Sequence, residues 1–391
     1  MHTQYDCIVC GAGPGGSWAA KAAAENGLRT LLLEKDREIG VPVRCAEGVG
    51  EAGLKSVVEP QERWIANVLT GAVLIAPNGQ EVVVEGNGER GLVLDRKIFD
   101  YELAVMAAAK GAEIKTKAYV FDLLKENGHV CGVKYKHLGK EIEARAGVVI
   151  GADGVESRVG RFAGLHTALK LKDIESCIQV TLANIKIDPR YIYVYFGQDI
   201  APGGYLWIFP KNENLANVGL GISGTNARQR AAMHYLEVFL KWRFPKASRV
   251  CTVVGGVPVA ASLKKIVTNA LMLVGDAAHQ VNPVTGGGIV TAMQAGRLAG
   301  QVAAEAVKVG DFSEELLSKY ADAWHKLEGK NHERFYRVKE AMLRFTDHDL
   351  NRTAEIIAKL PSGKRTLLNI FKNALTRHPS LLFDITKAFI R

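Results

Sequence analysis

The stretch YDCIVCGAGPGGSWAAKAAAENGLRTLLLEK, residues 5–35, decides the fold of this chain. A short apolar run leads into the glycine-rich GAGPGG, and an alanine-rich segment follows that ends at Asn26-Gly27. A second apolar run then finishes at Glu34. This order predicts a strand, a tight turn, a helix and a parallel second strand, which is the βαβ unit of dinucleotide-binding proteins.

The glycines of the turn and the acid after the second strand predict a phosphate and ribose site. Gly11 permits the tight turn, Gly13 lets a pyrophosphate approach the backbone, and Gly16 allows close packing of helix on strand. Gly15 belongs to the same expected cofactor contact. Free amides and the helix dipole at the start of the helix stabilise a diphosphate. Glu34 is expected to accept hydrogen bonds from an adenosine ribose.

Composition sets wide limits on the function. The chain has 391 residues, of which 48% are hydrophobic and 23% charged, so an ordinary folded protein with room for two domains is expected. Its net charge of +9 suits phosphates, acidic lipid head groups or nucleic acid, and charge alone does not choose among them. The dispersed basic residues show no nucleic-acid-binding module, so we expect no nucleic-acid partner.

Cellular location is predicted from three further features of the sequence. No secretory signal is apparent at the amino terminus, and no apolar run reaches transmembrane length. The six cysteines are scattered, as is typical of a reduced cytoplasmic chain, and we assign no metal-binding residues. We therefore expect a cytoplasmic protein, with peripheral membrane contact left open.

Two distant segments identify the dinucleotide. AGVVIGADGVESRVGRFAG, residues 146–164, is an apolar strand that ends in Asp153-Gly154. ALMLVGDAAHQVNPVTGGGIVTAMQAG, residues 270–296, delivers Gly275-Asp276 and then a glycine triplet that opens a helix. Together they resemble the DG and GD motifs of the FAD-dependent group that contains aromatic hydroxylases, flavin halogenases and geranylgeranyl reductases.

Two more segments are similar to the geranylgeranyl reductase family in particular. VPVRCAEG, residues 41–48, matches the family's PxxCxxG-like segment. GYLWIFPKNENLANVGLG, residues 204–221, matches its YxWxFPK motif followed by VGxG. The resemblance spans most of residues 1–310 with the motifs in the right order, and residues beyond that are supported only as a helical tail.

The resemblance implies the following cofactor contacts. Asp276 would bind the ribityl hydroxyls of FAD, Gly288 and Ile289 would offer backbone to the flavin end, Arg96 would lie near FAD, and Val120 would meet the adenine end. His279 in GDAAH is given a structural role in this pattern. The complete expected cofactor set is Gly11, Gly13, Gly15, Gly16, Glu34, Cys45, Ala46, Gly48, Arg96, Val120, Asp276, Gly288 and Ile289.

The implied activity is saturation of isoprenoid C=C bonds, with a geranylgeranylated glycerophospholipid as the expected substrate. Reduced FAD would deliver hydride from N5, and a proton would go to the other alkene carbon. Cys45 would lie near the isoalloxazine as a proton donor or as a pocket-lining residue. The electron donor is left open among NADPH, NADH and a small redox carrier, and the oligomeric state is not predicted.

The expected substrate residues lie in and after one strand. Strand alternation places Tyr205, Trp207 and Phe209 on one face, where they would hold the prenyl chain or simply pack in the core. Lys211 would lie near an anionic head group or on the surface. The complete expected substrate set is Tyr205, Trp207, Phe209, Pro210, Lys211 and Gly219.

The predicted architecture is α/β, or α+β overall: a Rossmann-like FAD domain with an inserted antiparallel-sheet substrate domain and a helical C-terminal region. The FAD domain is expected to be discontinuous, over residues 1–60, 90–165 and 265–310. The substrate domain would take residues 61–89 and 166–264, with a hairpin around Asn78-Gly79. Residues 311–391 would form helices that either dock on a membrane or pack on the protein.

Two other classes of function remain open from the sequence alone. A flavin monooxygenase or halogenase that acts on an aromatic compound would use the same FAD motifs. A lipid-binding flavoprotein without turnover would share both the motifs and the aromatic strand.

Overall fold

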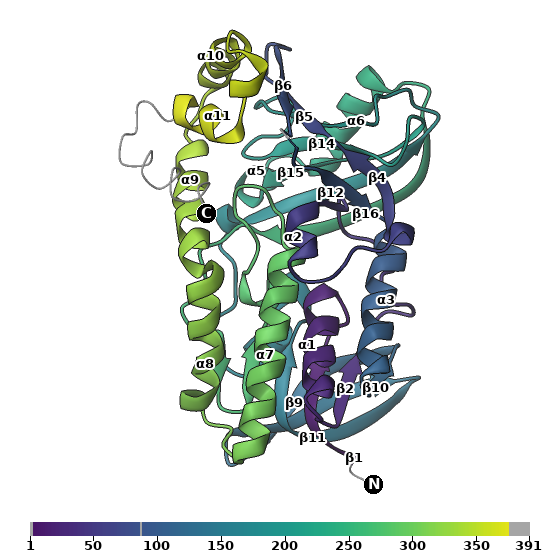
Figure 1. Cartoon of the computed structure of the whole chain (residues 1–391), viewed down its shortest axis with the longest axis vertical. Helices are drawn as coiled ribbons and strands as arrows, with labels where there is room; N and C mark the ends of the chain where they lie inside the picture. Colours follow the sequence, from purple (N-terminus) through teal and green to yellow (C-terminus); the bar gives the residue numbers. More distant parts are fainter. Residues whose placement is uncertain (1–2, 87, 375–391) are drawn as a thin grey trace.

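The computed structural model describes residues 3–86 and 88–374. Figure 1 shows two sheets at opposite ends of an elongated molecule, with helices α8 and α9 running along one side past both of them. The last part of the C-terminal region, residues 375–391, lies outside the described residues, and so does that part of the expected membrane-docking segment.

The first sheet carries the βαβ unit. Its eight strands have the order β17-β18-β11-β1-β2-β8, with β10 and β9 continuing from β11 as antiparallel strands. Strands β1, β2, β8, β11 and β18 are mutually parallel, and α1 (Pro14–Glu25) joins β1 to β2 as predicted. The strands are β1 (Thr3–Cys10), β2 (Thr30–Leu33), β8 (Glu113–Lys115), β9 (Ala118–Glu126), β10 (His129–His137), β11 (Lys140–Gly151), β17 (Val267–Thr268) and β18 (Leu271–Leu273).

Three helices associate with this sheet and with one another. Helix α1 lies between α7 (Ile289–Val309) and α3 (Arg96–Ala109), and all three begin at the same end of the sheet (Figure 1). The Asp95 carboxylate caps α3 by accepting from the Lys97 amide, and Gly310, with φ +74°, ends α7. The carboxyl ends of the parallel strands therefore meet several helix amino termini, where open α/β sheets bind ligands.

The second sheet has the predicted antiparallel character. Its order is β16-β12-β15-β14-β13-β5-β6, and only the β13–β5 pair is parallel. The β5–β6 hairpin turns at Asn78-Gly79, which confirms the turn expected there. Helix α6 (Ala232–Arg243) packs on one face of this sheet. The strands are β5 (Gly71–Ile75), β6 (Glu81–Glu85), β12 (Ile174–Ala183), β13 (Tyr191–Tyr195), β14 (Tyr205–Pro210), β15 (Leu215–Ser223) and β16 (Ser248–Pro258).

Smaller elements lie between the sheets, and helices complete the chain. Strands β3 (Gly48–Gly50), β7 (Gly91–Leu94) and β4 (Ile65–Leu69) form a three-stranded sheet beside α2 (Glu51–Lys55). Among the described residues, none of the helices has both the length and the apolarity needed to cross a bilayer. The remaining helices are α4 (Arg158–Phe162), α5 (Gly224–Ala227), α8 (Glu314–Trp324), α9 (Lys330–Met342), α10 (Asp347–Ala358) and α11 (Leu367–Ala374).

Candidate functional site

The glycine turn before α1 leaves the space that a pyrophosphate needs. Gly11 has φ +105°, and a Cβ on it would lie 2.3 Å from the carbonyl oxygen of Ala152. A Cβ on Gly16 would lie 1.8 Å from the Gly11 carbonyl oxygen. Gly13, the N-cap of α1, faces open space, and no side chain of the described chain caps the helix there. The first-turn amides are thus available to a diphosphate, so this turn fits the cofactor.

Glu34 lies at the end of β2 and is held against that turn. Its carboxylate accepts from the Ala12 amide at 2.8 Å and from the Asp36 amide at 2.9 Å. The amide of Ala118, at the start of β9, donates to the Glu34 carbonyl oxygen at 2.8 Å. Val120 follows two residues later on the same strand, so the two residues expected at the adenosine end occupy neighbouring segments.

The GD motif brings a carboxylate to the amino terminus of α7. Burial raises the pKa of Asp276, and the Arg96 guanidinium opposes that rise. A Cβ on Gly288, the N-cap of α7, would lie 3.6 Å from Asp276 Oδ1. Ile289 is the first residue of α7 and is buried. A carboxylate beside an uncapped helix start suits ribityl hydroxyls and a flavin that gains negative charge on reduction.

Arg96 and Cys45 lie close to each other, and Arg96 also acts on Asp276 of the GD motif. The Arg96 guanidinium makes a bidentate contact with the Asp100 carboxylate at 2.6 and 2.7 Å. Burial lowers the pKa of Arg96, but Asp100 and Cys45 outweigh it and hold the guanidinium charged. Burial raises the pKa of the Cys45 thiol, and its sulfur accepts from the Glu47 amide at 3.2 Å. Cys45 is therefore a neutral thiol near neutral pH.

Glu47 is an important residue that the sequence reasoning missed. Only 3% of its side chain is exposed, and it accepts from the Arg96 amide at 2.9 Å and from Asn217 Nδ2 at 2.5 Å. Lys211 Nζ lies 2.6 Å from the same carboxylate and its side chain is 16% exposed, so this lysine is largely buried in an ion pair, unlike the surface position that was one of its two expected locations. The sequence offered no local signal for this pair, because Glu47 and Lys211 are 164 positions apart and meet only in the folded chain.

The aromatic strand β14 turns its rings away from the core. Leu206 and Ile208 are fully buried beneath α6, whereas Tyr205, Trp207 and Phe209 are half-buried on the opposite face. The rings are therefore not the core-forming side of this strand. Alternation correctly predicted that the three rings share a face.

The aromatic face meets the cofactor loops at several points. Trp207 Nε1 donates to Gln179 Oε1 at 2.9 Å, and Gln179 Nε2 donates to the Cys45 carbonyl oxygen at 2.8 Å. Phe209 covers Gly48, where a Cβ would lie 2.2 Å from the ring. The expected prenyl-binding face and the expected flavin-facing loop therefore lie against each other.

Four expected residues make further contacts at this face. The Tyr205 hydroxyl donates to the Thr285 carbonyl oxygen at 2.5 Å, just before the glycine triplet. A Cβ on Gly219 would lie 2.7 Å from the Trp207 ring, so this glycine makes room for the indole. The Pro210 carbonyl oxygen accepts from Asn67 at 2.9 Å at the strand's exit. The Ala46 carbonyl oxygen contacts the Asn217 amide at 3.5 Å, so it too faces this sheet.

His279 lies apart from the aromatic face. Its ring Nε2 lies 3.2 Å from the Thr167 carbonyl oxygen, and its backbone is left-handed with φ +56°. Burial lowers its pKa, which keeps the imidazole neutral. These contacts suit the structural role expected for this histidine.

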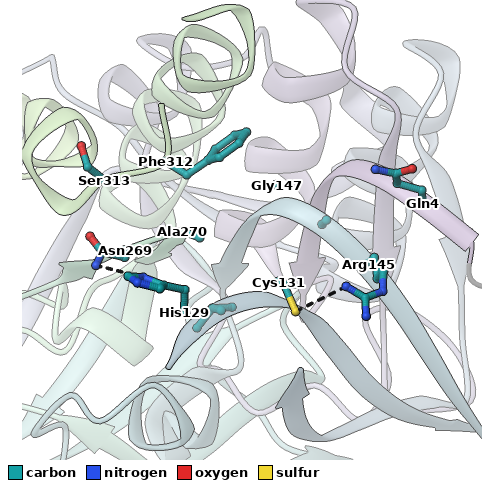
Figure 2. Close-up of a pocket in the computed structure, with 11 residues that line it drawn as sticks. Gln4, His129, Cys131, Arg145, Gly147, Asn269, Ala270, Phe312 and Ser313 are labelled. Carbon is teal, nitrogen blue, oxygen red and sulfur yellow. Dashed lines mark hydrogen bonds between the residues drawn. The ribbon is translucent and has the colours of Figure 1, made fainter. Parts of the chain in front are cut away.

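A cavity of about 540 Å³ at the other end of the first sheet holds none of the expected site residues. Figure 2 shows Phe312, His129 and Arg145 around it, where the Arg145 guanidinium donates a hydrogen bond to Cys131 Sγ. Gln4, near the start of β1, lines it, so it faces the amino ends of the parallel strands. Nucleotides bind at the carboxyl ends in such sheets, and we therefore do not assign it to the cofactor.

Comparisons with known proteins match this arrangement along the whole chain. A family described as the geranylgeranyl reductase catalytic domain matches residues 173–258, an FAD-dependent oxidoreductase family matches residues 6–191, and an FAD-binding domain matches residues 258–333. Digeranylgeranylglycerophospholipid reductase 2 of Methanococcoides burtonii is 46% identical, over 100% of this chain and 97% of its own. The Methanothrix thermoacetophila digeranylgeranylglycerophospholipid reductase is 47% identical, over 98% of both chains.

Solved structures show the same fold. A geranylgeranyl bacteriochlorophyll reductase-like protein from Thermoplasma acidophilum has a TM-score of 0.92 and 36% identity, with all of both chains covered. A flavin-dependent brominase has a TM-score of 0.70 at 19% identity, covering 97% of this chain and 100% of its own. At that identity the brominase shows the fold alone.

Proposed function

Because this chain belongs to the geranylgeranyl reductase family of FAD-dependent oxidoreductases, we propose that it saturates the C=C bonds of geranylgeranyl chains on a glycerophospholipid. The aromatic face joined to the Cys45 segment through Gln179 is the observation that carries the proposal. Long apolar chains bind along such a face, and its contact with the cofactor loops brings them to the flavin.

Different residues of this chain would bind FAD and orient the alkene. The turn at Gly13 would bind the pyrophosphate, Glu34 the ribose and Asp276 the ribityl chain. When bound, FAD supplies the hydride for the alkene. Trp207 and Phe209 would exclude water and fix the alkene over the cofactor, which matters because an unactivated alkene reacts slowly.

Electrons would reach FAD from outside this fold. We propose NADPH, NADH or a small redox carrier as a transient donor, because the glycine turn between β1 and α1 is assigned to FAD. The division of the chain into an FAD domain, a substrate domain and a C-terminal helical region, at the boundaries given above, is part of this proposal.

A lipid substrate also requires access to a bilayer. We propose that the protein is cytoplasmic and contacts the membrane peripherally. The contact would use an apolar and basic surface on α6 and β16, which is defined by Val238, Trp242, Val250 and Val254. These side chains are between 53% and 67% exposed. Lys241, Arg243 and Lys246 are exposed on or just after the same helix, so anionic lipid head groups complement the surface.

The activity test uses the FAD-loaded protein, reduced with dithionite without oxygen and incubated with digeranylgeranylglycerophospholipid. The proposal expects the lipid mass to rise by pairs of hydrogen atoms while the flavin absorbance returns. No mass gain across several prenyl lipids would contradict it. Oxygen-dependent NADPH oxidation that yields a hydroxylated aromatic product would favour the monooxygenase alternative. Lipid binding without any turnover would favour the non-catalytic flavoprotein.

A further inference from the structure

Glu175 on β12 extends its carboxyl group from the face of the sheet that carries the aromatic rings. Its Oε2 atom is buried and has no hydrogen-bond partner among the described residues. A Cβ on Gly204 would lie 3.0 Å from that oxygen, and a Cβ on Gly221 would lie 3.6 Å from it. Two glycines thus provide the space that this carboxyl occupies, so its position is built into the sheet.

Two other proton-bearing groups share this position. Glu175 and Cys177 are two residues apart on β12 and face the same side, and a Cβ on Gly221 would lie 3.0 Å from Cys177 Sγ. Tyr205 on β14 pairs directly with Gly221 on β15. Its hydroxyl reaches Thr285, next to the glycine triplet that opens α7. The group formed by Glu175, Cys177 and Tyr205 therefore extends from β12 to the expected flavin end.

The surroundings keep the Glu175 carboxyl neutral. Burial raises its pKa to about 8, and Lys339 on α9 only partly opposes the rise. Lys339 is already bound to Asp173 at 3.1 Å and to the Lys172 carbonyl oxygen at 2.9 Å. A buried carboxyl with no cation of its own prefers the protonated form.

The neighbouring acids are weaker than Glu175. Burial raises the pKa values of Cys177 and Tyr205, and the Glu175 charge raises both further. Burial also raises the pKa of the Cys45 thiol above its usual range. Among these groups Glu175 has the pKa nearest to neutral pH, which is where a general acid works best.

Residue Glu175 also borders a cavity near the surface. It lines a cavity of about 380 Å³ together with Ser176, Arg228 and Gly255. Leu171, Arg228 and Gly255 are exposed, so this cavity opens at the protein surface. Residue Glu175 therefore lies between the aromatic face and a cavity that is open to solvent.

We propose that Glu175 is the proton donor of the alkene reduction, an inference that rests on the proposed function. The O–H bond of the carboxylic acid breaks and its proton forms a C–H bond at one alkene carbon. The other carbon would receive a hydride, which reduced FAD would supply when bound, so the alkene would gain two electrons and the reduced flavin would lose two. Glu175 is left as a carboxylate and takes a proton from solvent before the next turnover.

Glu175→Gln tests this in the FAD-loaded protein, because glutamine keeps the shape and removes the acidic proton. Flavin reoxidation by prenyl lipid, followed in a single anaerobic turnover, should slow by about 10²-fold or more at unchanged lipid affinity. The wild-type rate should fall as pH rises through about 8, where Glu175 ionises, and the residual rate of the variant should show no such fall. Glu143→Gln, the same change at an exposed position on β11, is the matched control and should keep the wild-type rate.

A second measurement does not depend on turnover. The infrared carbonyl band of a protonated carboxyl should disappear as pH rises through about 8 in the wild type and be absent from Glu175→Gln. A wild-type rate and pH profile in Glu175→Gln would overturn the proton-donor role and leave the reductase function standing. A wild-type protein that reduces no prenyl lipid would overturn the reductase function and this role with it, even if the infrared titration shows the band.

Discussion

At the residue scale, the buried Glu47 carboxylate is paired with one cation, Lys211, in the part of the chain that the structure describes. Lys211→Met removes that cation and leaves the carboxylate with only its neutral partners, Asn217 and the Arg96 amide. We expect the free energy of unfolding to fall by about 3–5 kcal/mol, measured by urea denaturation, because an unpaired buried charge is left behind.

The control for this change is an exposed ion pair. Lys265→Met removes a pair with Glu314 in which both side chains are more than 40% exposed, and stability should change little. Equal effects of Lys211→Met and Lys265→Met would show that the Glu47 pair contributes no more than a surface contact. Glu47→Gln combined with Lys211→Met should restore part of the loss, because no buried charge then remains.

The thiols give a second prediction at this scale. Burial raises the pKa of Cys45, so little of it is thiolate near pH 7, whereas Cys251 is exposed on the edge strand β16. Iodoacetamide should therefore modify Cys251 first and Cys45 slowly, as judged by peptide mass spectrometry over time. Cys45 modified as fast as Cys251 would show that its environment stabilises the thiolate, contrary to the structure.

Single residues were predictable where the backbone itself demanded them. Gly11 and Gly16 follow from the geometry of a tight turn, and the structure leaves no space for a Cβ at either one. The partner of Lys211 was not predictable, because Glu47 is 164 positions away and reaches it only through the packing of one sheet on a loop. Glu175 is similar, since its space depends on glycines of two other segments.

At the element scale, the contact between α1 and α7 ties the two halves of the cofactor site together. A Cβ on Gly296 would lie 2.1 Å from the Gly15 carbonyl oxygen and 3.0 Å from the Ala19 amide nitrogen. Gly296→Ala should therefore push α7 away from the phosphate turn. We expect a loss of about 1–3 kcal/mol in the free energy of unfolding, together with weaker FAD retention on desalting.

Gly53→Ala is the matched control for this helix contact. Gly53 lies in α2, and a Cβ there would meet Val290 at an ordinary 3.6 Å. The change should leave FAD retention intact and leave stability equal or higher by roughly 0.5–1 kcal/mol, as for glycine to alanine in a helix. If Gly296→Ala retains FAD fully, the α1–α7 contact is not needed for cofactor binding.

Periodicity predicted the elements better than it predicted their orientation. The alternation in β14 correctly grouped its rings, but both faces of the strand are apolar, so the pattern did not say which one is the core. Leu206 and Ile208 form the core side because α6, which begins 22 residues after β14 ends, covers that face. Such long-range packing leaves no local trace in a strand's own sequence.

At the scale of the whole molecule, the two sheets enclose the site and expose a different surface outward. The α6/β16 surface lies on the side of the second sheet opposite the aromatic strand's rings, because Val254 pairs with the core residue Ile178. The Arg249–Glu237 ion pair, at 2.5 Å, joins β16 to α6 across this surface. An apolar and basic surface beside a lipid-binding fold suits reversible docking on an anionic bilayer.

Vesicle binding tests that surface. The wild-type protein should sediment with vesicles that contain anionic lipid, and less so as salt screens the contribution of Lys241, Arg243 and Lys246. Trp242→Ser, at a side chain that is 67% exposed, should weaken binding because it removes the largest apolar group that could enter the interface. Tyr101→Ser on α3, at 58% exposure, removes a similar group elsewhere and should leave binding unchanged. If Trp242→Ser and Tyr101→Ser bind equally well, α6 is not the element that meets the lipid, and the membrane contact must be sought on another face.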